Sequence, residues 1–258
     1  MTPEEIAQVA PRLVGFTAEM LASLPRADQR AVGELYVRGL LMDGKRKSMQ
    51  PMAERLGVDH QRLQQFITSS TWDFTAVRRA VAGWAAEVIR PEAYVIDDSG
   101  FPKDGGASAC VARMYCGALG KTGNCQIGVS VQMVTDAASV AADWRLFCPE
   151  SWDDTTISDE AVAVEVRRRR ARAGLPDEVR HREKWLLALD MLDNLINDWG
   201  HPKLPVTADA GYGDITAFRL GLEERGLDDA LAVSPKLIAH PVDAVPTLLP
   251  TSGLGRPS

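Results

Sequence analysis

The sequence predicts an α/β (α+β) protein in which an all-helical N-terminal region precedes a mixed β-sheet flanked by helices. Apolar side chains recur at helical spacing through about the first 92 residues, whereas the later run Cys125 to Thr135 alternates apolar and polar residues. A chain of 258 residues is long enough to bury a sizeable core. We therefore expect helices over 1–92, a sheet with its helices over 93–236, and an irregular tail over 237–258, where prolines and glycines interrupt every pattern.

Composition restricts the class of protein. Hydrophobic residues make up 45% of the chain and charged residues 25%, which is ordinary for a soluble globular protein. No apolar run is long enough to cross a bilayer and the N-terminus lacks a basic signal-peptide start, so we expect a cytoplasmic protein with no membrane partner. The four cysteines lack metal-finger spacing, which favours reduced thiols.

The net charge of −6 does not exclude a DNA partner, because basic residues cluster locally. One cluster is Lys45, Arg46 and Lys47, and a second comprises Arg167 to Arg170 together with Arg172. For each cluster, contact with phosphate groups and simple exposure to solvent are equally consistent with the sequence.

The N-terminal region contains a pattern typical of a helix-turn-helix. We expect a short helix over Met52 to Leu56, a left-handed conformation at Gly57 that ends it, and a second helix capped by Asp59. The second helix offers Gln61, Arg62 and Gln65 to DNA. The alternative interpretation is a plain helical hairpin that does not read DNA.

A further helix is predicted between Asp73, its N-terminal cap, and Pro91, which stops it. Val77, Val81, Trp84 and Val88 fall on one face of this helix, so we expect that face, tryptophan included, to be buried.

The stretch from Ala93 to Phe101 predicts a buried strand that ends in two acids, Asp97 and Asp98. Successive side chains of a strand point to opposite faces, so only one of the two can face a given site. Lys103 follows in a glycine-rich loop, where it either contacts a phosphate group or is a solvated turn residue. Further strands are expected at Cys125 to Thr135 and around Trp144 to Cys148, in an antiparallel meander.

Helices then dominate to Gly200, followed by a short strand that ends at Asp209, a helix, and a last strand at Ala230 to Val233. This order is that of a ribonuclease H-like fold, in which the first and fourth strands lie side by side and parallel. Asp98 and Asp209 would then meet at one sheet edge, where two carboxylates can bind a pair of Mg²⁺ ions about 3.5–4 Å apart. Taken alone, each aspartate is more often a turn residue or a helix cap.

Four segments resemble the DDE superfamily transposases of bacterial insertion sequences: VIDDSGFPKDG, ARMYCGALGKTGNCQIGVSV, DWRLFCPESW and VTADAGYGD. The resemblance extends from about Tyr36 to Lys236. It implies a metal site with Asp98, which Ser99 follows, as the first acid and Asp97 in reserve, and with Asp209 as the second acid.

The resemblance also implies the cofactor and the partners. Two Mg²⁺ (or Mn²⁺) ions would support the cleavage and joining of double-stranded DNA at the terminal inverted repeats of the element. The protein would act in the nucleoid, as a homodimer on DNA. The DNA-binding candidates are Lys45, Arg46, Lys47, Gln61, Arg62, Gln65 and Lys103.

The third acid of such enzymes, a glutamate on a helix beyond the last strand, has no counterpart here. Glu223 and Glu224 precede the last predicted strand, so the expectation is a C-terminally truncated copy that is inactive alone. Two alternatives are kept: a non-catalytic DNA-binding remnant that regulates transposition, and a ribonuclease H-like hydrolytic nuclease.

Overall fold

The computed structural model describes residues 3–238 and 243–245, with side chains from residue 8 onward. Most of the predicted irregular tail at 237–258 therefore lies outside the described residues.

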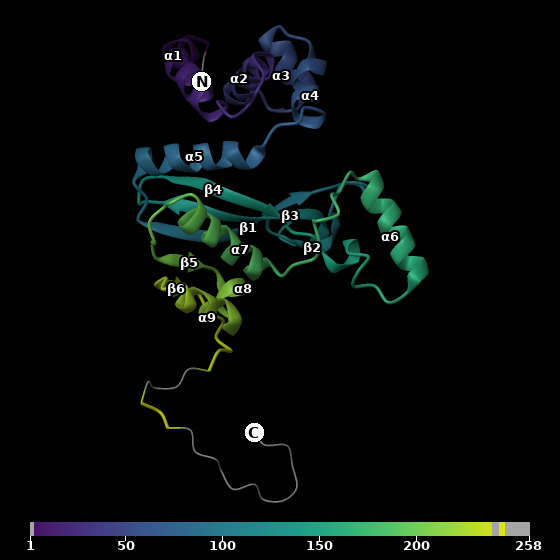
Figure 1. The fold of residues 1–258 in the computed structure, drawn as a ribbon, viewed down its shortest axis with the longest axis vertical. Coiled ribbons are helices and arrows are strands. Elements are labelled where there is room, and N and C mark those ends of the chain that lie inside the picture. Colours follow the sequence, from purple (N-terminus) through teal and green to yellow (C-terminus); the bar gives the residue numbers. More distant parts are fainter. Residues whose placement is uncertain (1–2, 239–242, 246–258) are drawn as a thin grey trace, which may run out of the picture.

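Four helices form the N-terminal bundle, which lies above the sheet in Figure 1. They are α1 (Pro3–Met20), α2 (Ala27–Leu41), α3 (Met49–Leu56) and α4 (His60–Thr68). Leu24, Met52 and Leu63 are buried together in a core that belongs to this bundle. Gly57 has φ 67°, where glycine has no Cβ to clash, and the side chain of Asp59 accepts a hydrogen bond from the Gln61 N–H at 3.0 Å. The predicted turn between α3 and α4 is thus confirmed.

Helix α5 (Phe74–Ile89) joins the bundle to the sheet and runs along strand β4 (Ser139–Leu146) (Figure 1). Asp73 caps it, as predicted, by accepting from the N–H groups of Thr75 and Ala76. The predicted buried face is wrong. Ala82 and Ala85 are buried, because small side chains let the helix approach the sheet closely, while Val88 is 58% exposed and Trp84 lies against Phe16 of α1 with ring centroids 4.8 Å apart.

The sheet has six strands within the described residues, and the fold class is confirmed as a ribonuclease H-like mixed sheet. The other strands are β1 (Ala93–Pro102), β2 (Ala112–Cys116), β3 (Lys121–Val134), β5 (Val206–Ala208) and β6 (Asp229–Leu231). Their order is β2-β3-β1-β5-β6, with β4 also paired to β3. Strand β3 is antiparallel to its three neighbours, whereas β1, β5 and β6 run parallel.

Two strand predictions need correction. Strand β4 begins at Ser139 and ends at Leu146, so Cys148 lies beyond it, in a separate buried cluster with Cys110 and Trp152. Strand β2 was not predicted, because ARMYC is short and carries only a weak alternation of apolar and polar residues.

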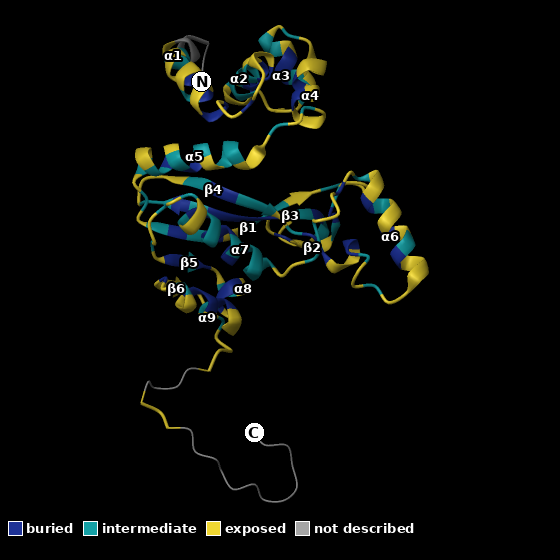
Figure 2. Cartoon of the chain, viewed as in Figure 1, coloured by how far each residue is buried: buried dark blue, intermediate teal, exposed yellow. Residues whose placement is uncertain are grey.

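Helices cover one face of the sheet and close its core. They are α7 (Lys184–Asp193) with its π-helical extension η3 (Asn194–Asp198), the short α8 (Ala210–Gly213), and α9 (Thr216–Glu224). Tyr94 and Ile96 of β1 pack in the same buried cluster as Leu192 and Phe218. In Figure 2 the dark blue of buried residues is found along the central strands of the sheet. Helix α6 (Glu160–Arg172), with the 3₁₀ turn η2 (Glu150–Trp152), projects to the side near β2 (Figure 1).

A buried ion cluster ties α5 to the sheet. The Asp143 carboxylate is fully buried in β4; it accepts hydrogen bonds from Arg78 of α5 and, at 3.0 Å, from Arg145, while Arg78 also donates to the Trp144 carbonyl at 2.7 Å. Burial raises the pKa of Asp143 even though both arginines act to lower it. The ionised carboxylate therefore depends on both arginines for its stabilisation.

We expect Arg78→Ala to lower the free energy of unfolding by about 2–3 kcal/mol, because it removes one of the two guanidinium groups that neutralise a buried carboxylate and leaves Arg145 as the remaining charged donor to Asp143 and to the Trp144 carbonyl. The neighbouring Arg79 is exposed, so Arg79→Ala is the matched control and should change stability by less than about 0.5 kcal/mol. Urea unfolding followed by circular dichroism measures both. Equal stabilities of the two variants would contradict the assigned role of Arg78.

Candidate active site

The candidate site lies where the parallel pairing of β1 with β5 ends. The sequence predicted that the first strand would end at Asp97 and Asp98, but β1 continues to Pro102, because its pairing with β3 extends that far. Strand β1 pairs with β5 in the register Tyr94 to Val206 and Ile96 to Ala208. The next residues along each strand are acidic: Asp97 and Asp98 on β1, and Asp209 directly after β5. The chain thus brings acids separated by more than a hundred residues to one edge.

Asp98 is held by two side chains from the helices that cover the sheet. The Tyr212 hydroxyl donates to Asp98 Oδ1 at 2.6 Å, and Lys184 Nζ donates to Asp98 Oδ2 at 2.5 Å. Lys184 is the first residue of α7, and Tyr212 lies in α8, where it is only 4% exposed. Both carboxylate oxygens of Asp98 therefore have a donor.

The other two acids are more exposed. Asp97 Oδ1 accepts from the backbone N–H of Asp98 at 2.7 Å, and Asp209 caps α8 by accepting from the Gly211 N–H at 2.9 Å. A Cβ at Gly211 would lie 3.0 Å from Asp209 Oδ1, so glycine leaves room for this capping carboxylate.

The charges of all three acids act on one phenol. Burial raises the pKa of Tyr212 most, and Asp98, Asp209 and Asp97 raise it further. The hydroxyl consequently stays protonated and remains a donor to Asp98. Of the three carboxylates, Asp98 is the one that the hydroxyl contacts.

Carboxylate oxygens are hard ligands of the kind that Mg²⁺ and Mn²⁺ prefer, so the donors at this edge fit such an ion. Among the described residues, however, no group of three or more His, Cys, Asp or Glu side chains is arranged to hold a metal. Lys184 already supplies a positive charge at Asp98 Oδ2. Lys184 is thus the counterion of Asp98.

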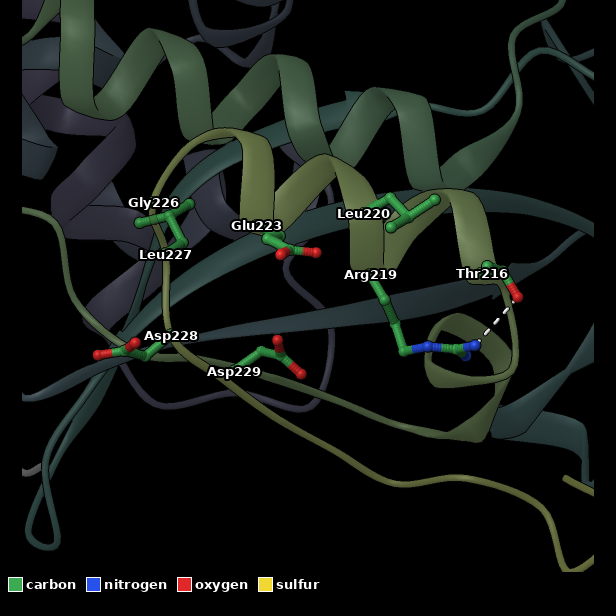
Figure 3. A pocket seen from close by; sticks show the side chains of 8 residues that line it. All are labelled: Thr216, Arg219, Leu220, Glu223, Gly226, Leu227, Asp228 and Asp229. Carbon is green, nitrogen blue, oxygen red and sulfur yellow. Dashed lines mark hydrogen bonds between the residues drawn. The ribbon is translucent and has the colours of Figure 1, made fainter. Parts of the chain in front are cut away.

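A pocket of about 750 Å³ lies elsewhere, between α9 and β6 (Figure 3). Its lining residues are Thr216, Arg219, Leu220, Glu223, Gly226, Leu227, Asp228 and Asp229. None of these is a predicted site residue, and three acids against one arginine make the pocket unsuited to phosphate groups. Glu223 lies on α9, between β5 and β6, which is where the sequence predicted it and Glu224.

The predicted DNA-binding residues of the bundle are exposed. Lys45, Arg46 and Lys47 lie in the loop between α2 and α3. Lys47 donates a hydrogen bond to the Met42 carbonyl, and Arg55 donates one to the Arg46 carbonyl at 2.9 Å. Gln61, Arg62 and Gln65 lie on the exposed side of α4. Lys103 is partly buried at the end of β1, and its N–H donates to the Asn124 carbonyl.

The second basic cluster differs, because its arginines are bound by the chain itself. Arg167 pairs with Glu160, and Arg168 and Arg172 both pair with Glu165. Arg170 is buried and donates to three backbone carbonyls. The arginines of this cluster therefore make contacts within α6 and with the segments next to it.

Sequence reasoning missed Lys184 and the hydrogen bond of Tyr212. Lys184 is 86 residues from Asp98, and nothing in the sequence distinguishes it from any lysine that begins a helix. Tyr212 could have been noticed, because an aromatic residue three positions after a capping aspartate lies on the side of the turn that faces the sheet.

A ribonuclease H-like sheet with aspartates on one strand and directly after its parallel neighbour, here β1 and β5, is typical of nucleic acid cleaving and joining enzymes. Comparison with known families gives a match over residues 19–258 to the DDE superfamily endonucleases, and the chain belongs to this family. Endonucleases of this superfamily generally use divalent metal ions.

One relative gives more detail. Over 96 residues the chain is 36% identical to the "Probable transposase for insertion sequence element IS701" of Microchaete diplosiphon. That stretch covers 36% of this chain and 25% of the relative. Within the residues that the structure describes, no helix combines the length and apolar character needed to cross a membrane.

Proposed function

We propose that this chain is the transposase of an insertion sequence, or part of one, and that it acts on double-stranded DNA at the terminal inverted repeats of its element. The observation that carries the proposal is the parallel pairing of β1 with β5, which brings Asp98 and Asp209 to one sheet edge within a DDE superfamily chain. The named transposase relative supports the same class of reaction.

Within this proposal, Asp98 and Asp209 hold Mg²⁺ or Mn²⁺, and Asp97 is the alternative first ligand. The metal ions, when bound, would activate the attacking oxygen and stabilise the leaving oxygen of a phosphodiester. Tyr212 orients Asp98 through its hydrogen bond, and Lys184 neutralises the carboxylate. The exposed cations and glutamines of the bundle bind the element ends. The protein acts as a homodimer on DNA in the nucleoid.

A second candidate function is a non-catalytic DNA-binding regulator of transposition. It is favoured by the absence of a three-acid group among the described residues. Two carboxylates leave a second metal ion poorly held, because it would depend on water and phosphate oxygens for the rest of its ligands. A purely hydrolytic nuclease has no observation of its own in its favour.

These functions are separated by one assay with the 258-residue chain. We expect it to bind a duplex that carries the element ends and to leave that duplex uncut in Mg²⁺ or Mn²⁺, since two acids alone hold the ions weakly. Gel shift and denaturing gels report binding and cleavage in the same samples. Cleavage that Asp98→Ala and Asp209→Ala both abolish would show that two acids suffice, and absence of binding to any DNA would overturn the transposase proposal.

A further inference from the structure

A groove of about 410 Å³ lies between α1 and α5, on the side of the molecule away from α6 (Figure 1). Its apolar lining comes from Val9, Leu13 and Phe16 of α1, Leu41 of α2, and Trp84 and Val88 of α5. The rings of Phe16 and Trp84 meet edge to face and join the two helices. The groove, here called the α1–α5 groove, is therefore a feature of the packed helices and not of a loose loop.

The α1–α5 groove leaves large apolar side chains in contact with solvent. Val88 is 58% exposed, Leu41 43% and Trp84 36%. Single exposed apolar side chains are common, but several in one groove mark an interaction surface. Within one chain, the apolar face that the sequence predicts for α5 is only partly covered: Val77 packs against the bundle core, whereas Trp84 and Val88 line the groove. A partner in the groove would bury the remainder of that face.

Two opposite charges of α1, Arg12 and Glu19, also line the groove. They are seven residues apart, which is about two helical turns and roughly 10 Å along the axis, so they lie on one side of the helix. Both are exposed, and within the part of the chain that the structure describes neither forms an ion pair. Gly15 lies between them, and a Cβ built there would meet nothing within 4 Å, so a second helix can approach α1 closely.

We propose that the α1–α5 groove is occupied by a second copy of this chain, with the two α1 helices antiparallel about a two-fold axis near Gly15. A two-fold axis pairs residue i of one protomer with residue j of the other and also j with i. Arg12 of each protomer therefore lies opposite Glu19 of the other, and the interface contains this ion pair twice. A parallel arrangement would instead place like charges together. The charge pattern of α1 is thus complementary to itself in the antiparallel arrangement.

The chemistry of the groove favours a second copy over DNA. An apolar lining with one cation and one acid offers no surplus of positive charge to phosphate groups. The inference deepens the proposed function and rests on it for its role, because it names the surface through which the proposed homodimer forms. Two joined chains would present two bundles, one for each end of the element.

The first test is sedimentation velocity of the full 258-residue chain without DNA, between about 1 and 100 μM, where an interface of micromolar affinity dissociates. We expect a monomer–dimer equilibrium. Arg12→Glu and Glu19→Arg should each raise the Kd of the dimer about tenfold or more, because each replaces two attractive pairs by two repulsive ones. The double variant Arg12→Glu with Glu19→Arg restores both pairs with their charges exchanged, and should return the Kd to within about threefold of the parent value.

The second test places a charge in the apolar part of the groove. Val88→Lys should raise the Kd about tenfold or more, because the ammonium group would be buried by the partner. Val14→Lys is the matched control: Val14 is 44% exposed and lies on the other side of α1, where it lines a separate depression with Arg30 and Glu34. This control should leave the Kd unchanged. Circular dichroism verifies that both variants remain folded.

A parent chain that stays monomeric over this concentration range would overturn the second copy as the occupant of the groove. Failure of the double charge reversal to restore the dimer, or equal losses in Val14→Lys and Val88→Lys, would also contradict the assigned interface. Gel shift with a duplex that carries the element ends separates this inference from the proposed function. If the chain binds the duplex but the groove variants do not change the dimer, the groove inference fails alone. If the dimer behaves as expected but no DNA is bound, the proposed function fails alone.

Discussion

Asp98→Asn and Asp209→Asn are each expected to weaken Mn²⁺ binding by about tenfold or more, measured as free Mn²⁺ by electron paramagnetic resonance. Each substitution removes one of the two proposed anionic ligands and keeps the side-chain volume. Both side chains can still accept hydrogen bonds from Tyr212 or Gly211, so the fold is expected to persist. Asp97→Asn tests which aspartate of β1 is the metal ligand. It should change Mn²⁺ affinity little if Asp98 is the ligand, and more than Asp98→Asn does if Asp97 is the ligand.

Lys184→Met should act in the opposite direction and tighten Mn²⁺ binding by about threefold. The ammonium group and a metal ion compete for Asp98 Oδ2, and a partly exposed ion pair of this kind contributes less than about 1 kcal/mol. Unchanged affinity in Lys184→Met, with binding lost in Asp98→Asn, would show that the lysine and the metal occupy different sides of the carboxylate. If neither aspartate variant changes Mn²⁺ binding, the metal site lies elsewhere.

The triple variant Lys45→Ala, Arg46→Ala and Lys47→Ala should cause the largest loss of DNA affinity. These three exposed side chains lie next to α3 and α4, the helix pair proposed to bind DNA, so we expect them to contact phosphate groups beside the bound site. Removing three contacts should lower the slope of log K against log salt by roughly 2.7 on duplex DNA, which amounts to a loss of more than tenfold near 100 mM salt. Fluorescence anisotropy at several salt concentrations measures it.

A matched control for this triple variant exists in the same bundle. Arg26 and Arg38 are paired with Asp28 and Glu34, so Arg26→Ala and Arg38→Ala remove charge without removing an available cation. Both should leave the slope unchanged. Equal losses in the control and the triple variant would mean that net charge of the bundle, and not the loop, determines binding. Substitution is preferable to deletion of residues 1–92, because α5 is part of that range and packs on β4 through Arg78 and Asp143.

The domain limits at residues 92 and 236 thus remain predictions. The packing of α5 belongs to both parts: Ala82 lies in the same buried cluster as Tyr94 and Val131 of the sheet, while Val77 packs against the bundle core. A domain limit placed by residue number need not match the boundary between the two buried cores, because one helix can pack against both cores.

Local sequence patterns were sufficient to predict several elements of the fold. Alternation from Ile127 to Met133 predicted β3, and Gly57 with Asp59 predicted the turn between α3 and α4, because these preferences arise from the backbone of the residues concerned. The order of strands and helices was enough to predict that β1 and β5 are neighbours. That order also indicated that acids would follow the paired residues of both strands, but not that β1 would continue to Pro102.

Other features were decided only by tertiary structure. The face of α5 that is buried depends on how closely a helix can approach β4, and this favoured Ala82 and Ala85 over the larger valines. The extent of β2 depends on its pairing with β3, which a five-residue segment does not reveal by itself. Lys184 became a partner of Asp98 because the start of α7 lies close to the middle of β1, although the two residues are 86 positions apart. Such contacts depend on the packing of whole elements, whereas caps, turns and alternation depend on a few adjacent residues.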